Sequence, residues 1–157
     1  MEKKNKNNGK QRSVKSTPTI QSKRVKGGTV FGLISAGVAV AASVVYYLQY
    51  NQTQYFDNLA FLLPLIGVAL FLIVGMIPPV ANFAPVALWA AAFAGLLLYV
   101  HAVYMYLSEV FYSGVTPETI ASIDPGFVIT TLLYLVASIL TNIAAWVKQR
   151  KTVVVNK

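Results

Sequence analysis

The sequence predicts an all-α membrane protein: an up-down bundle of four transmembrane helices with both ends of the chain in the cytoplasm. Composition is the first reason, since 56% of the 157 residues are hydrophobic and only 11% are charged, against about 25% in soluble domains. The second reason is that all 13 lysines and arginines lie before residue 27 or after residue 147. A cation at the centre of a membrane helix costs roughly 2.5–3.5 kcal/mol on insertion scales, so the cation-free stretch suits the bilayer.

The two ends of the chain differ in composition from the stretch between them. Residues 1–27 are rich in Lys, Asn, Gln, Ser and Gly, which predicts a disordered basic tail, and residues 149–157 form a second basic tail. Residues 28–148 are the predicted transmembrane domain. We interpret the first tail as an orientation signal with weak contact to anionic membrane lipid. Binding to nucleic acid is not expected, because this tail has no aromatic residue.

The predicted spans are about 29–50, 59–77, 86–107 and 126–147. The first has about 22 residues, or ~33 Å at 1.5 Å per residue, whereas the apolar region of a cleaved signal peptide has about 7–15. We therefore expect an uncleaved anchor. Aromatic residues at its end are expected to form a belt at the outer interface of the membrane: Tyr46, Tyr47, Tyr50, Tyr55 and Phe56.

Prolines limit the second span. A helix that began at Pro64 would have about 14 residues and a length of ~21 Å, too short for a hydrocarbon core of about 30 Å. We therefore expect the helix to begin before Pro64, to kink there, and to end at Pro78 and Pro79.

The loop before the fourth span contains a pattern typical of a helix start. Thr116, Pro117 and Glu118 match an N-cap residue, a proline at the first helical position and an acid in the first turn. A short surface helix is therefore predicted over Pro117–Ile123. Asp124 and the proline after it repeat the pattern and begin the fourth span.

Charge determines the predicted orientation. Four spans put both ends on one side, and because both ends are basic, this side is the cytoplasmic one. The predicted location is the plasma membrane. The outer loops carry acids and no cation: Asp57, Glu109, Glu118 and Asp124.

Small residues mark candidate packing faces on two helices. Gly28, Gly32 and Ala36 recur at every fourth position of the first span, and Ala87 and Ala91 do so in the third. Such faces let helix backbones approach closely. We interpret them as packing within the bundle; a seam between two chains is the alternative.

Polar residues within the spans form a candidate intramembrane site. At 100° per residue, Thr131, Ser138 and Asn142 of the fourth span fall within about 40° of one another. His101, the only histidine, shares a face of the third span with Ala90 and is expected to point into the bundle. We interpret these side chains as hydrogen-bonding groups that join helices; proton or ligand chemistry at His101 is the alternative.

Residue types also exclude classes of function. The chain has no cysteine and no Gly-x-Ser-x-Gly, phosphate-loop or His-Glu-x-x-His motif, so we expect no enzymatic activity, no cofactor and no metal site. The expected function is an accessory or structural subunit of a larger membrane complex, for example a transport complex, with a membrane-protein partner or further copies of the chain. The alternative is a small oligomeric transporter or channel that uses His101 and the polar stripe. Against it, no predicted span contains Asp, Glu, Lys or Arg.

Overall fold

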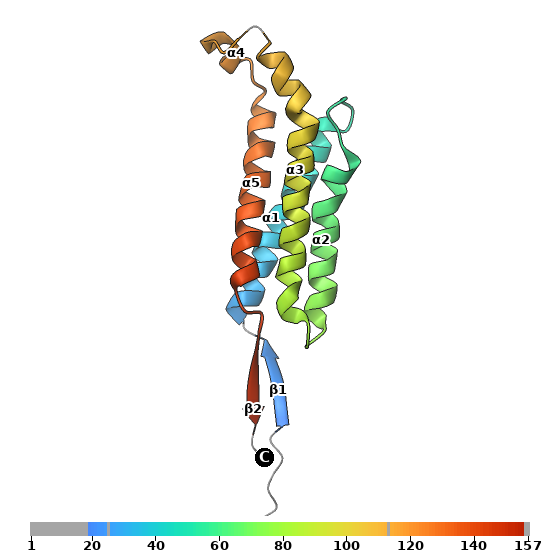
Figure 1. The fold of residues 1–157 in the computed structure, drawn as a ribbon, viewed down its shortest axis with the longest axis vertical. Helices are drawn as coiled ribbons and strands as arrows, with labels where there is room; N and C mark the ends of the chain where they lie inside the picture. Colours follow the sequence, from blue (N-terminus) through green and yellow to red (C-terminus); the bar gives the residue numbers. More distant parts are fainter. Residues whose placement is uncertain (1–18, 25, 113, 156–157) are drawn as a thin grey trace, which may run out of the picture.

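Four long helices run along the long axis of the molecule (Figure 1). The computed structural model describes residues 19–24, 26–112 and 114–155. Each of the four helices is long and apolar enough to cross a membrane, as the sequence predicts. The helical elements are α1 (Lys26–Tyr50), α2 (Asn58–Met76), the 3-10 turn η1 (Ala81–Phe83), α3 (Ala84–Val110), the short α4 (Pro117–Ala121) and α5 (Pro125–Trp146).

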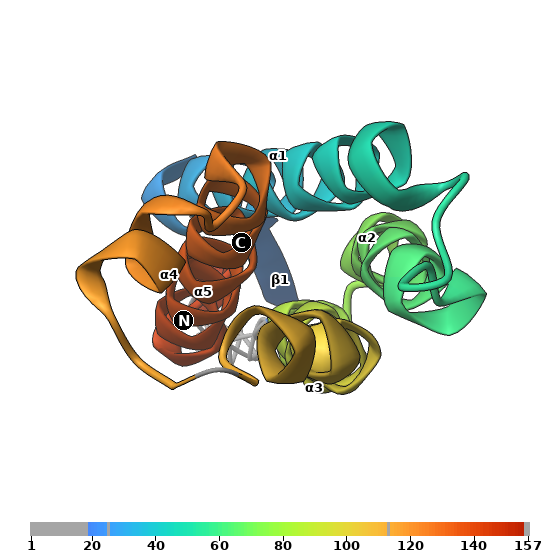
Figure 2. The same ribbon diagram turned by 90° about the horizontal axis from the view of Figure 1, so that it is seen from above.

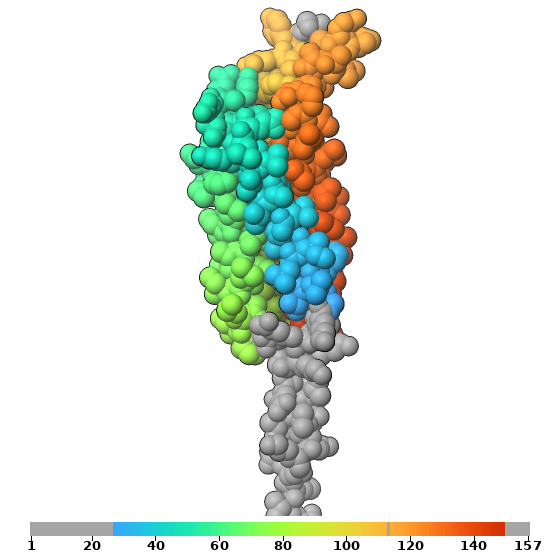
Figure 3. Space-filling model, turned by 180° about the vertical axis from the view of Figure 1, so that it is seen from behind, coloured from blue at the N-terminus to red at the C-terminus, as the bar shows by residue number. Residues whose placement is uncertain are grey.

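The four long helices enclose a common core. Seen along the bundle, α2 lies beside α3, α3 beside α5, and α5 beside α1, so that α1 and α3 are diagonally opposed (Figure 2). Helix α1 crosses one face obliquely, between α2 and α5 (Figure 3). The grooves that remain on the surface therefore lie between neighbouring helices.

Local capping explains where α2 begins and ends. The Asp57 side chain accepts a hydrogen bond of 2.8 Å from the backbone N–H of Leu59, and the helix starts at Asn58. Pro64 therefore lies inside the helix, as predicted. The helix ends at Met76, ahead of the two prolines that cannot continue it.

The connection from α3 to α5 contains the predicted short helix. The Thr116 hydroxyl accepts from the N–H of Thr119 at 3.2 Å, and the Thr119 hydroxyl accepts from the N–H of Thr116 at 2.8 Å. This reciprocal capping box starts α4. Asp124 then caps α5 by accepting from the N–H of Gly126 at 3.2 Å.

Two short strands lie at the end of the bundle opposite α4 (Figure 1). Strand β1 (Thr19–Arg24) pairs with β2 (Arg150–Val155) in an antiparallel ribbon. The prediction of disorder in the first tail is therefore wrong for Thr19–Arg24, whereas residues 149–157 were predicted only to be basic. Three consecutive valines in β2 favour a strand. The basic composition of this segment led to the prediction of a tail instead. Residues 1–18 of the predicted tail lie outside the described residues.

Tyrosines occupy the core of the bundle, surrounded by alanines. Tyr46 is fully buried and Tyr50 is 5% exposed, so the prediction that they face the membrane in an aromatic belt is wrong. Ser43 and Ala42 are both buried. Tyr46 follows Ser43 by three residues and Ala42 by four, so all three side chains lie on one face of the helix. Tyr47, on the other face, is 42% exposed.

Candidate functional site

Three buried tyrosines from three helices fill the centre of the bundle. Tyr99 of α3 and Tyr134 of α5 stack with ring centroids 4.8 Å apart and an interplanar angle of 3°. Tyr46 of α1 meets both rings edge-on, at 5.4 Å and 6.0 Å. Offset-stacked and edge-to-face geometries are the favoured ones for aromatic pairs. The sequence analysis missed this cluster, although tyrosines within the third and fourth spans were the signal that could have revealed it.

Each hydroxyl of the tyrosine cluster has a hydrogen-bond partner. Tyr46 Oη accepts from the N–H of Asp57 at 2.7 Å and donates to the carbonyl of Tyr55 at 3.0 Å, which fixes the loop between α1 and α2. Tyr99 Oη lies 2.8 Å from the Thr131 hydroxyl. Tyr134 Oη donates to the carbonyl of Ala60 at 3.0 Å. The cluster therefore joins all four long helices.

The bond from Tyr134 has a specific origin in the sequence. Pro64 has no N–H, so the carbonyl of Ala60, four residues earlier, loses its helical donor. In a membrane such a freed carbonyl needs another partner, and the Tyr134 hydroxyl supplies it. Gly95 of α3 makes room for the proline, because a Cβ there would lie 2.6 Å from Cγ of the Pro64 ring.

A second polar network lies at the end of the bundle near α4. The Gln49 amide donates to a carboxylate oxygen of Asp124 at 2.6 Å, and its Oε1 accepts from the Thr130 hydroxyl at 2.8 Å. Tyr55 donates to the Glu109 carboxylate at 2.5 Å, and this bond raises the pKa of the Tyr55 phenol above its usual value. The carboxylates of Asp124 and Glu109 thus accept hydrogen bonds that connect loops with helices. No group of three or more metal-ligating side chains occurs among the described residues.

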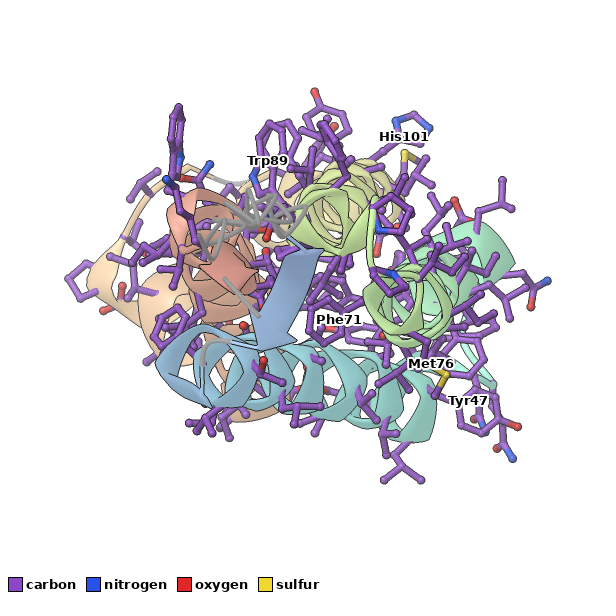
Figure 4. The ribbon with its side chains drawn as sticks, turned by 90° about the horizontal axis from the view of Figure 1, so that it is seen from below. Tyr47, Phe71, Met76, Trp89 and His101 are labelled. Carbon is purple, nitrogen blue, oxygen red and sulfur yellow. The ribbon has the colours of Figure 1, made fainter. Side chains whose placement is uncertain are left out.

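The four predicted polar residues do not share one site. Thr131 lies within the bundle, bonded to Tyr99, and also donates to the carbonyl of Phe127 at 2.8 Å. His101 is exposed and points away from the bundle (Figure 4), so the prediction that it points inward is wrong. Tyr99 lies on the inner face of α3. His101 follows two residues later, which turns its side chain about 200° around the helix, to the outer face.

Ser138 and Asn142 line a groove on the membrane-facing surface between α3 and α5. Its volume is about 350 Å³. The Ser138 hydroxyl is buried and has no hydrogen-bond partner among the described residues, while Asn142 is exposed. Apolar and aromatic side chains supply the rest of the lining: Trp89, Phe93, Leu96, Leu135, Ile139 and Ile143.

The small residues of α1 pack within the bundle. A Cβ at Gly28 would collide with the backbone carbonyl of Lys148, and one at Gly32 would lie 2.6 Å from the Phe71 ring. Phe71 points into the bundle from α2 (Figure 4). Ala36 is 4% exposed.

The small residues of α3 also lie against a neighbouring helix, although Ala87 and Ala91 are only half-buried. A Cβ at Gly67 of α2 would lie 2.6 Å from the Ala91 methyl. Both predicted small-residue faces thus serve contacts inside one chain.

The chemistry available at these sites is hydrogen bonding and apolar contact. Comparison with known proteins adds no assignment: no protein-family model, no curated protein and no solved structure matches this chain.

Proposed function

We propose that this chain is a non-enzymatic, membrane-embedded subunit of a larger membrane complex. The observation that carries the proposal is the outward placement of polar side chains at membrane depth: His101 and Asn142 are both exposed. Polar side chains in the membrane are costly in contact with lipid and usually face protein. A partner protein on the outer faces of α3 and α5 would provide the hydrogen bonds that these residues lack in lipid.

Within this proposal, the four helices run up and down through the plasma membrane with both ends in the cytoplasm. Two features support this orientation. The paired strands β1 and β2 lie together at one end of the bundle, and both contain cations. The opposite end has α4 and the acidic residues Glu118 and Asp124, and an excess of cations marks the cytoplasmic side of membrane proteins.

Purification of the full chain from native membranes in a mild detergent tests the proposed function. We expect a different membrane protein to co-purify in fixed stoichiometry, as identified by mass spectrometry. The matched variants are His101→Leu, which removes an outward polar group, and Val100→Leu, which changes its apolar neighbour, also exposed. Loss of the partner only in the first variant supports the proposal. A chain recovered without any stoichiometric protein partner contradicts it.

A small oligomeric transporter or channel is the second candidate. The same outward placement of His101 and Asn142 favours it, since in an oligomer these groups would line a path between copies. The tyrosine cluster argues against a path through a single bundle, because it fills the centre. Solute flux through liposomes that contain only this chain distinguishes the two: flux supports the transporter, whereas sealed liposomes support the subunit.

A further inference from the structure

The groove between α3 and α5 has a mainly apolar lining that also contains two polar side chains. On the α3 side, Trp89 and Phe93 lie with ring centroids 6.0 Å apart and an interplanar angle of 23°. On the α5 side, Ile139 is 58% exposed and stands at the lip of the groove. Ser138 and Asn142 line the same groove, whose volume is about 350 Å³.

The Ser138 hydroxyl is exceptional among the buried hydroxyls of the described membrane helices. No other buried side-chain oxygen or nitrogen of the described residues lacks a hydrogen-bond partner; for example, Ser35 donates to the carbonyl of Phe31 at 2.7 Å, and Thr141 donates to that of Ala137 at 2.8 Å. Ser138 is 92% buried, since 8% of its surface is exposed, yet its oxygen has no partner within the described chain. An unpaired hydroxyl in an apolar medium costs free energy.

Asn142 lies one helical turn beyond Ser138 and lines the same groove. Its amide contains two donors and an acceptor with two lone pairs. A lipid acyl chain would fill the apolar part of the groove but has no hydrogen-bonding group for this amide. An occupant with hydrogen-bonding groups at the depth of Asn142 would satisfy both parts of the groove.

We propose that the occupant is a second copy of this chain, which docks so that the two α3/α5 grooves face each other and the two Asn142 amides pair. Two copies related by a two-fold axis along the membrane normal bring identical residues together. The two Asn142 side chains then lie at the same depth in the membrane. Because an amide is both donor and acceptor, each copy donates to the other. The inference rests on the proposed role as an associating subunit and identifies one partner.

Cysteine cross-linking tests the pairing, because the chain has no native cysteine. Ile139→Cys places a thiol at the lip of the groove. Leu70→Cys is the matched control, an exposed leucine at similar depth on α2, diagonally across the bundle. The full chain is purified and reconstituted alone into phosphatidylcholine liposomes at high lipid-to-protein ratio. We expect a cross-linked dimer from Ile139→Cys and monomer from Leu70→Cys.

The role of the amide is tested in the same liposomes by fluorescence energy transfer between labelled copies. Asn142→Leu removes the hydrogen bonds at an exposed position and is expected to weaken dimerisation about 3- to 30-fold. Asn142→Gln keeps an amide and is expected to retain most of the association. Ser138→Ala probes the second hydrogen-bonding group and is expected to weaken dimerisation less than Asn142→Leu.

Other outcomes overturn the inference in distinguishable ways. Equal cross-linking at both cysteine positions, or unchanged association of Asn142→Leu, shows that the groove is not the interface. A monomer in liposomes, with a different protein bound in native membranes and lost in Asn142→Leu, contradicts the second copy but supports the proposed function. A monomer without any partner in native membranes contradicts both.

Discussion

Replacing Tyr134 by phenylalanine removes one hydroxyl from the centre of the bundle and leaves its ring in place. Stacking on Tyr99 and the edge contact with Tyr46 are retained, so the change isolates the bond to the Ala60 carbonyl. That carbonyl has lost its helical donor to Pro64 and would be left without a partner. We expect the free energy of unfolding to fall by about 1–2 kcal/mol. This value lies between the average of about 0.6 kcal/mol for a hydrogen bond between membrane helices and the upper cost of about 3 kcal/mol for a buried group left unpaired.

The same substitution in a Pro64→Ala background gives a sharper test. An alanine at residue 64 restores the backbone N–H, which can bond to the carbonyl of Ala60 within the helix. The Tyr134 hydroxyl is then no longer needed, and we expect its removal to cost about 0.5 kcal/mol or less. The four variants form a double-mutant cycle with a coupling of about 1 kcal/mol, from which any cost of removing the proline ring cancels.

Reversible unfolding in mixed micelles, titrated with sodium dodecyl sulfate and followed by far-UV circular dichroism, measures all four free energies. An equal cost of Tyr134→Phe in both backgrounds would refute the reasoning, because it would show that the hydroxyl does not substitute for the donor missing at Pro64.

Three further predictions concern packing, the ribbon and the histidine. Gly95→Ala is expected to destabilise the bundle by about 1–3 kcal/mol through overpacking, because its Cβ would collide with the ring of Pro64. Gly37→Ala is the control and should not destabilise the bundle, because a Cβ there has no atom within 4 Å. Similar losses of stability for the two variants in unfolding titrations would contradict this prediction. A cysteine pair at Ser22 and Thr152, which are opposed in the ribbon, should oxidise to a disulfide on non-reducing gels more readily than a pair shifted two positions along β2. His101→Leu is expected to change the free energy of unfolding by about 0.5 kcal/mol or less, as for other surface positions, and a loss above 2 kcal/mol would show that the side chain packs inside.

The four spans were predictable from the sequence because hydrophobic length and the exclusion of cations report directly on the bilayer. Pro64 inside α2 and the short α4 followed from the same local physics: a minimum helix length and the capping pattern at Thr116. These features depend on neighbouring residues in the chain.

The inner and outer faces of the helices were harder to predict. A membrane helix is apolar on its lipid-facing side as well as inside, so periodicity does not distinguish the two sides. Polarity alone predicts that His101 points inward and that Tyr46 lies at the interface. The structure has the reverse arrangement, because tyrosine hydroxyls find partners within the bundle. The ribbon depends on pairing between segments at opposite ends of the chain, and composition alone does not reveal such pairing.

The proposed arrangement, four membrane spans with both ends of the chain in the cytoplasm, is open to one direct measurement. Single cysteines replace Val115, which is 74% exposed before α4, and Thr152 in β2, in a chain without other cysteines. Cells are treated with a membrane-impermeant maleimide before and after permeabilisation. We predict labelling of Val115→Cys in intact cells and of Thr152→Cys only after permeabilisation. Labelling of Thr152→Cys in intact cells, or none of Val115→Cys, would contradict the proposed topology.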